Sequence, residues 1–160
     1  MLPGRGLSAT TSGGSLISKV AVQGPLSANY EVNITVALNA SDGDYAEYLR
    51  ATSNSLTGTG SYFSVEPQNP TFNGTTGAYT ATLAAFQAVN SSVTQLYSTP
   101  VACHNGMQVR TAILGTVAYI ILDGNTMWVP GVTVSGMPGI GGRNMPSTNA
   151  ISRTTSRRSL

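Results

Sequence analysis

The sequence has few charged side chains, and this shortage limits the partners that the chain can bind. Only 9% of its 160 residues are charged, with a single lysine and a formal net charge of +2. A globular domain usually has about a quarter of its residues charged. Three of the eight basic residues, Arg153, Arg157 and Arg158, lie in the last eight positions. The rest of the chain is nearly neutral, so it lacks the basic surface of a nucleic-acid-binding protein.

Cysteine, histidine and long apolar runs are also scarce. Cys103 is the only cysteine, so no intrachain disulfide can form, and we expect a small buried apolar residue there. His104 is the only histidine, and neighbours on a strand point to opposite faces, so the two do not form a catalytic dyad. The longest dense apolar run, 117–122, is far shorter than the roughly 20 residues of a membrane-spanning helix.

The same apolar stretch, "ILGTVAYIILDGNTMWVPG", indicates β-structure. Val, Ile, Tyr and Thr dominate it, and β-branched and aromatic side chains favour a pleated strand over a helix. Asp123-Gly124 lies between the β-rich runs 117–122 and 126–129, and an Asp-Gly pair tolerates the positive φ of a tight hairpin turn. We therefore predict a hairpin. We also expect Trp128 to lie in the core.

Short β-rich segments separated by turn residues recur along the chain. In "YEVNITVAL" (30–38), apolar and polar residues alternate with a period of two, as in a half-buried strand. The pattern predicts strands at residues 16–23, 30–38, 45–52, 61–66, 78–89, 93–99, 107–114, 117–122, 126–129 and 149–152. We expect the strand at 61–66 to end at "PQNP".

This spacing predicts an all-β protein, an antiparallel two-sheet jelly-roll sandwich, in one domain. We assign 1–15 as a flexible lead-in, 16–152 as the jelly-roll domain and 153–160 as a basic disordered tail. The lead-in has no apolar segment of the kind found in a signal peptide.

The order of "YEVNITVAL", "DYAEYLRATSNS", "GTGSYFSVEPQN", "YTATLAAFQAVNSSVTQLYST", the Asp-Gly hairpin and "GMPGIGGRN" resembles the concanavalin A-like (laminin G-like) jelly roll of bacterial extracellular modules. The resemblance covers about residues 16–152 and implies one concave sheet, an extracellular or cell-surface location, and binding of glycans or proteins. It does not imply one function, because this fold also contains enzymes and spacer modules.

The acidic residues give little support to catalysis. Glycoside hydrolysis with retention needs two carboxyl groups about 5–5.5 Å apart, and the six acids show no Glu-x-Asp-x-Glu pattern on one strand. A catalytic pair formed by Glu47 and Glu66, brought together by the fold, is left as an alternative. Asp42 and Asp44 in "NASDGD" could supply oxygens to Ca²⁺, and the alternative is a plain polar turn.

Two predicted strands place aromatic and planar polar side chains on one face. Sugars stack their apolar faces on aromatic rings and need hydrogen bonds for their hydroxyls. The candidate ligand-binding residues are Tyr48, Arg50, Tyr62, Glu66, Gln68 and Asn69. An Arg50–Glu66 pair that only stabilises the sheet surface is the alternative.

We therefore predict a non-catalytic extracellular binding or adhesion module whose partner is a carbohydrate or cell-surface ligand. The first alternative is a structural subunit that assembles with copies of itself through edge strands into a surface layer or filament. The second is a glycoside hydrolase. No nucleic acid, membrane span or certain cofactor is expected.

Overall fold

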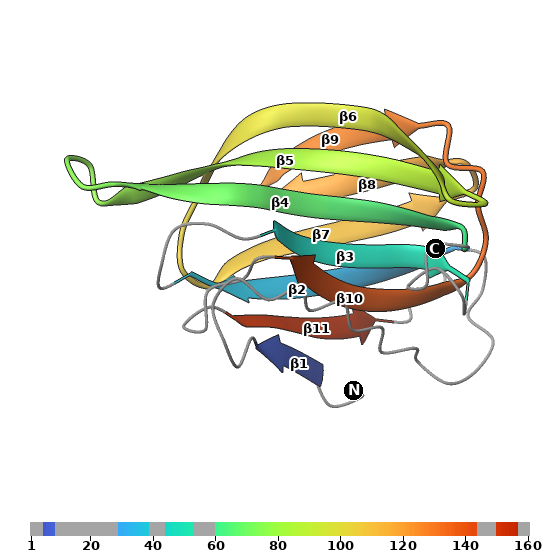
Figure 1. The fold of residues 1–160 in the computed structure, drawn as a ribbon, viewed down its shortest axis with the longest axis horizontal. Coiled ribbons are helices and arrows are strands. Elements are labelled where there is room, and N and C mark those ends of the chain that lie inside the picture. The colour runs from blue at the N-terminus through green and yellow to red at the C-terminus, as the bar shows by residue number, and fades with distance from the viewer. Residues whose placement is uncertain (1–4, 9–28, 39–43, 53–59, 144–149, 157–160) are drawn as a thin grey trace.

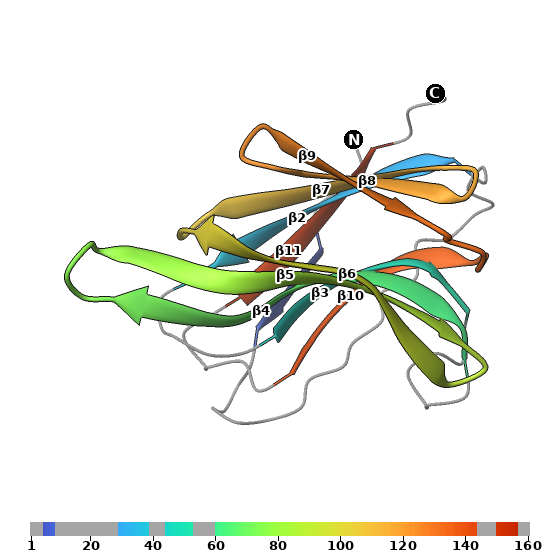
Figure 2. The same ribbon diagram turned by 90° about the horizontal axis from the view of Figure 1, so that it is seen from above.

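The computed structural model describes residues 5–8, 29–38, 44–52, 60–143 and 150–156. In these ranges the chain forms eleven strands and no helix. Two layers of antiparallel strands lie against each other, as Figures 1 and 2 show from two directions. The strand predicted at 16–23 lies outside the described residues.

The two sheets have six and five strands. Sheet A has the order β1 (Arg5–Ser8), β11 (Ala150–Ser156), β2 (Tyr30–Ala37), β7 (Met107–Leu114), β8 (Val117–Leu122) and β9 (Asn125–Pro130). Sheet B has the order β10 (Met137–Arg143), β3 (Asp44–Ala51), β4 (Tyr62–Asn73), β5 (Ala78–Val89) and β6 (Ser92–Cys103). The long β4–β5 hairpin extends beyond the other strands at one end (Figure 1).

The core forms where the inner faces of the sheets meet. On β2 the even-numbered residues Val32, Ile34 and Val36 have no exposed surface, and their neighbours are only half-buried, as the period of two predicts. Phe63 and Val65 on β4 enclose the core from sheet B and are also fully buried. Burying such side chains, at about 1.5–3 kcal/mol each, fixes which face of each strand points outward.

Tight turns connect the strands as the sequence predicts. Asp123 and Gly124 have φ values of 48° and 82°, as the two central positions of a type I′ hairpin turn require. The prediction of the β8–β9 hairpin is therefore confirmed. Asn90 and Ser91, with φ values of 46° and 72°, form the corresponding two-residue turn between β5 and β6.

The prediction that a strand ends at "PQNP" is wrong, because β4 continues to Asn73. The β3–β4 ladder has pairs at Glu47–Val65 and Asp44–Gln68 and none between them, where Pro67 lies. The β4–β5 ladder shifts register between Gln68 and Thr71, where Pro70 lies. A proline is tolerated in a strand where its missing N–H removes no ladder bond or where a bulge interrupts the ladder.

The sandwich also extends beyond the predicted domain bounds of 16–152. β1 lies within the expected lead-in and pairs with β11, and β11 continues to Ser156, opposite Glu31 of β2. β10, in "MPGIGGR", was not predicted, because its glycines and proline show no alternation of apolar and polar residues. β1 and β10 are edge strands of the two sheets, and β11 pairs with both β1 and β2.

One side of the sandwich presents the edge strands β6 and β9, which carry no charged side chain. Free edges invite pairing with other chains, and natural sheets discourage it with prolines, bulges and short strands. β6 has Pro100 and a bulge opposite Ala85–Phe86, and β9 is six residues long and ends at Pro130. These features work against the edge-to-edge assembly that was our first alternative.

Candidate functional site

The outer face of sheet B carries the predicted ligand-binding residues on its central strands. On β4, Phe63 and Val65 point into the core, so the alternating residues Ser64, Glu66 and Gln68 point outward. Ser64 is 0% exposed and Glu66 is 7% exposed, whereas Gln68 is half-buried. A ligand on this face would therefore reach Gln68 before it reached the carboxylate.

The Glu66 carboxylate is held by its two neighbours on the same strand. Ser64 Oγ donates to Glu66 Oε1 at 2.7 Å, and Gln68 Nε2 donates to Glu66 Oε2 at 3.1 Å. Hydrogen bonds to a charged group are stronger than neutral ones. Glu66 thus fixes the side-chain amide of Gln68, which leaves the Gln68 carbonyl oxygen and second N–H for other partners.

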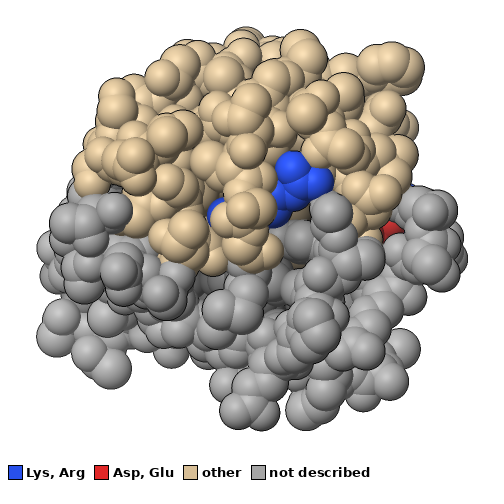
Figure 3. Space-filling view, turned by 90° about the vertical axis from the view of Figure 1, so that its right-hand side faces the viewer, with Lys and Arg blue, Asp and Glu red and all other residues tan. Residues whose placement is uncertain are grey.

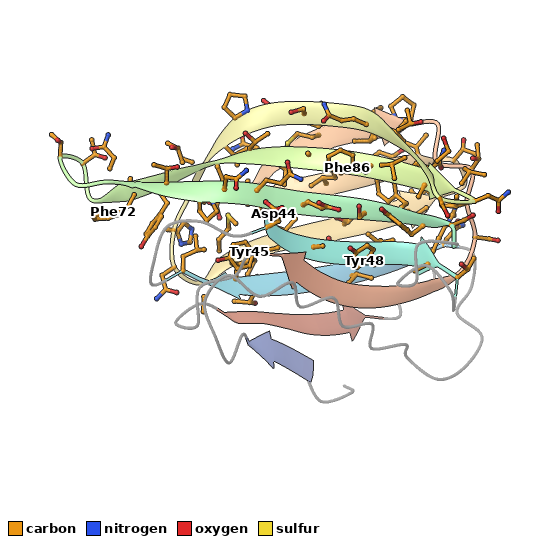
Figure 4. The ribbon with its side chains drawn as sticks, viewed as in Figure 1. Asp44, Tyr45, Tyr48, Phe72 and Phe86 are labelled. Atoms are coloured by element: carbon orange, nitrogen blue, oxygen red, sulfur yellow. The ribbon has the colours of Figure 1, made fainter. Side chains whose placement is uncertain are left out.

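Three aromatic side chains border this polar row. Tyr48 on β3 and Phe86 on β5 both lie opposite Ser64, one on each side of β4, and Figure 4 shows them in the middle of the sheet. The rings of Tyr48 and Tyr62 meet edge to face, with centroids 5.2 Å apart and planes at 84°. All three aromatic residues are half-buried, so part of each ring is accessible.

Asn69 lies at the end of this row, where β4 bends. Its φ of 49° and the register shift between Gln68 and Thr71 mark a β-bulge. Bulges redirect side chains, and the Asn69 side chain is exposed as a result. The Asn69 carbonyl accepts a hydrogen bond from Thr71 Oγ1 at 3.3 Å, which supports the bend.

Arg50 lies at the other end of the outer face and has a structural contact there. It is 7% exposed, its φ is 51°, and its Nη1 donates to the Val134 carbonyl at 3.4 Å. The ladder register places Arg50 four residues along the strands from Glu66, about 13 Å at 3.3 Å per residue. The guanidinium therefore supports the connection between β9 and β10, and a role in ligand binding stays a prediction.

The calcium prediction rests on residues that the structure describes only in part. Asp42 lies outside the described residues, and Asp44 begins β3 opposite Gln68. Among the described residues, no group of three or more His, Cys, Asp or Glu side chains could hold a metal ion. Calcium binding therefore stays a prediction.

Glu47 lies between the sheets, on the inner face of sheet B. It is fully buried, and its Oε2 accepts a hydrogen bond from Thr111 Oγ1 on β7 at 2.7 Å. Glu66 points away from the core on the same sheet, so the two carboxyl groups have the sheet between them. They cannot act on one glycosidic bond, and this removes the pair that our hydrolase alternative left open.

His104 and Cys103 show no sign of nucleophilic chemistry. Burial, followed by the nearby Asp123 carboxylate, raises the pKa of the Cys103 thiol to about 11, so the thiol stays protonated at neutral pH. The prediction that Cys103 is buried is confirmed. His104 Nε2 lies 3.3 Å from Asp123 Oδ2 and Nδ1 lies 2.9 Å from the Asn105 carbonyl oxygen, so both ring nitrogens are engaged.

The prediction that Trp128 lies in the core is wrong. Its side chain is 67% exposed, because β9 is an edge strand and the inner positions are occupied by Met127 and Val129. Ser64 and Phe86 also belong to the outer face of sheet B and were not among the predicted residues. The alternation along 61–66 and 78–89 could have placed both on the outer face, but the pairing of the two strands could not be read from either segment alone.

The surface has as few charges as the composition suggests. On the side shown in Figure 3, the described surface shows one small group of basic atoms and a single acidic patch in an otherwise uncharged area. The described part of the chain contains no helix that is long and apolar enough to cross a membrane.

Similar proteins were found among solved structures alone. No protein-family model matches the sequence, and no curated protein matches it. The carbohydrate-binding module CBM66 from Bacillus subtilis superposes with a TM-score of 0.56 at 14% identity, over 95% of this chain and 80% of that module. Sheep galectin-11, in a complex with glycerol, superposes with a TM-score of 0.55 at 11% identity, over 89% of this chain and 98% of that chain. The galectin LEC-6 from Caenorhabditis elegans superposes with a TM-score of 0.55 at 12% identity, over 91% of this chain and 94% of that chain.

These similarities concern the fold, since all three identities are below 15%. They confirm the predicted class, an all-β antiparallel jelly-roll sandwich of the type found in galectins and carbohydrate-binding modules. The finer resemblance to laminin G-like and bacterial extracellular modules stays a prediction.

Proposed function

We propose that this chain is a non-catalytic, extracellular glycan-binding module whose ligand lies on the outer face of sheet B. The main support is that Tyr48 and Tyr62, whose rings contact each other, lie on the same outer face as the Gln68 amide that Glu66 holds in place, four and six residues along the strands from it, or about 13 and 20 Å. Aromatic rings can stack on the C–H face of a sugar, and a fixed amide can both donate to and accept from its hydroxyls. The module CBM66, which has a similar fold, is a carbohydrate-binding module, and this agrees with the proposal.

Glu66 acts below the ligand in this arrangement. Because it is only 7% exposed and already accepts two hydrogen bonds, its role is to orient Gln68, while Asn69 at the bulge extends the polar row. A neutral glycan fits a surface with few charges, since it offers hydroxyls and no ionic group. The low charge and the abundance of Ser, Thr and Asn are also common in extracellular proteins.

A glycan array followed by NMR titration tests the proposal. Glycans that bind on the array should shift backbone amide resonances at Tyr62, Gln68 and Asn69. Tyr62→Ala and Gln68→Ala should each weaken binding about tenfold or more, as truncating a central contact does. Phe72→Ala is the matched control, because Phe72 is an exposed aromatic residue on the same strand beyond the bulge (Figure 4).

The proposal fails if no glycan binds, or if binding glycans leave the resonances of β3, β4 and β5 unchanged. Light scattering of the purified chain separates it from the assembly alternative. The binding module should be a particle near 16.5 kDa, and a large polymer would favour a structural subunit.

A further inference from the structure

A second aromatic surface lies on the outer face of sheet A, on the opposite side of the sandwich from the proposed site. On β8, Ala118, Ile120 and Leu122 are buried, so Tyr119 points outward. The ladder places Trp128 of β9 directly opposite Tyr119, and their rings contact each other with centroids 5.3 Å apart and planes at 64°. Trp128 is 67% exposed, the most exposed of the large apolar side chains in the described ranges.

This aromatic pair continues into a row of residues across four strands. The register aligns Trp128 and Tyr119 with Ala112 of β7 and Glu31 of β2. Glu31 Oε1 lies 3.3 Å from Arg110 Nε, so an ion pair stands at the far end of the row. Ala112 between them is buried, with 9% of its surface exposed, so the accessible part of the row is formed by the aromatic pair and Arg110.

The chemistry of the row suits an oligosaccharide. An indole and a phenol ring give a flat apolar surface for the C–H face of one sugar unit. The Arg110 guanidinium on β7, whose side chain is 45% exposed, can donate to the hydroxyls of the next units, and the Glu31 carboxylate, only 12% exposed, holds it in place. Three gaps between neighbouring strands span about 14 Å, which suits a short straight chain of sugar rings.

The size of the surface argues against a protein partner. From the position of Pro130 to that of Thr126 the platform extends four residues, so its area is roughly 14 by 13 Å, about 200 Å². A stable protein interface buries about 800 Å² on each partner and has an apolar centre. Here Val117, Ile121, Thr126 and Pro130 flank the two rings on the same face, and their area is too small for such an interface.

We propose that Tyr119 and Trp128 bind the flat face of a neutral β-1,4-linked oligosaccharide, and that Arg110, held by Glu31, donates hydrogen bonds to its hydroxyls. This site is separate from the one proposed on sheet B. It would give the module two carbohydrate contacts on opposite faces, so that one copy could connect two glycan chains.

Tryptophan fluorescence tests this site specifically, because Trp128 is the only tryptophan in the chain and lies on sheet A. Cellotetraose, xylotetraose and chitotetraose are titrated separately into the intact protein. At least one should change the Trp128 emission in a saturable manner, and the same titration should be unaffected by Tyr62→Ala on sheet B. This second result separates the platform from the site of the proposed function, since either site can fail without the other.

Calorimetry with the same probe then tests the individual residues. These measurements use Tyr62→Ala protein as the background, so that only the sheet A site binds. In this background Trp128→Ala and Arg110→Ala should each weaken binding about tenfold, and Trp128→Phe should retain most of the affinity. The matched control is Phe72→Ala, which removes another exposed aromatic side chain. The ring of Phe72 also contacts a tyrosine, Tyr79, with ring centroids 5.0 Å apart. The inference is overturned if none of the three probes changes the emission, or if Trp128→Ala binds as tightly as the Phe72→Ala control.

Discussion

The buried hydrogen bond between Thr111 and Glu47 provides a quantitative test of how the two sheets are joined. Both side chains are fully buried, and the Oγ1–Oε2 distance is 2.7 Å. Thr111→Val keeps the shape of the side chain and removes the donor. Removing the donor leaves a buried acceptor unsatisfied, which costs about 1–3 kcal/mol. We expect a decrease of that size in the free energy of unfolding.

For a domain of 160 residues, this decrease corresponds to a fall in Tm of roughly 2–12 °C, at about 2–4 °C per kcal/mol. Urea denaturation followed by circular dichroism measures the change, with Thr111→Ser as the control that keeps the hydroxyl. A double-mutant cycle with Glu47→Met isolates the pair from the other contacts of Glu47, and the coupling should be at least about 1 kcal/mol. A Thr111→Val protein within about 0.5 kcal/mol of the parent, the usual range for an ordinary surface change, would refute the reasoning.

Four other changes test separate parts of the structure. Gly136→Ala should destabilise the fold by about 2–5 kcal/mol in the same denaturation assay, because its φ is 153° and a Cβ would overlap the Ala51 carbonyl; Gly74→Ala, with open space around it, should be neutral. The Cys103 thiol should react with a disulfide reagent far more slowly in the folded protein than in urea, since burial raises its pKa to about 11; equal rates would contradict this. An NMR titration should give His104 a pKa above its ordinary value of 6.5, because the Asn105 carbonyl and then Asp123 favour the protonated ring. The stabilisation from that ring should be complete below pH 6.5 and lost as the pH rises through the folded-state pKa. Glycan binding should not change with salt concentration, and a marked loss of affinity at high salt would indicate an acidic ligand.

The period of two was sufficient to predict β2, and β-rich segments between turn residues were sufficient to predict β5, β7 and the β8–β9 hairpin. Both signals failed for β10, whose glycines carry no pattern, and at Pro67, where the effect of a missing N–H depends on the neighbouring strand. The candidate site was predictable as a set of outward-pointing residues on β3 and β4. Which residues would meet across the strands depends on register, which no single segment contains.

The position of Trp128 shows the same limit most clearly. An apolar side chain next to a hairpin is expected in the core, and Met127 and Val129 do point inward. The one-residue offset that exposes Trp128 follows from the Asp123-Gly124 turn, which pairs Leu122 with Asn125 and so aligns Tyr119 with Trp128. Because the turn fixes this register, the outward aromatic pair follows from the same residues that form the hairpin.

Several of the few charged side chains are held by neighbouring side chains in the structure. Glu31 faces Arg110, Asp123 faces His104, and Glu66 holds Ser64 and Gln68. Each of these groups is engaged with a neighbour in the protein, so the outer faces offer a ligand mainly rings, amides and hydroxyls, with the half-exposed Arg110 guanidinium in addition on sheet A. Such surfaces gain little from long-range attraction and depend on close contact with a flat, hydroxyl-rich partner. This is the reason that a neutral glycan suits sheet B and, separately, the Tyr119–Trp128 platform of sheet A.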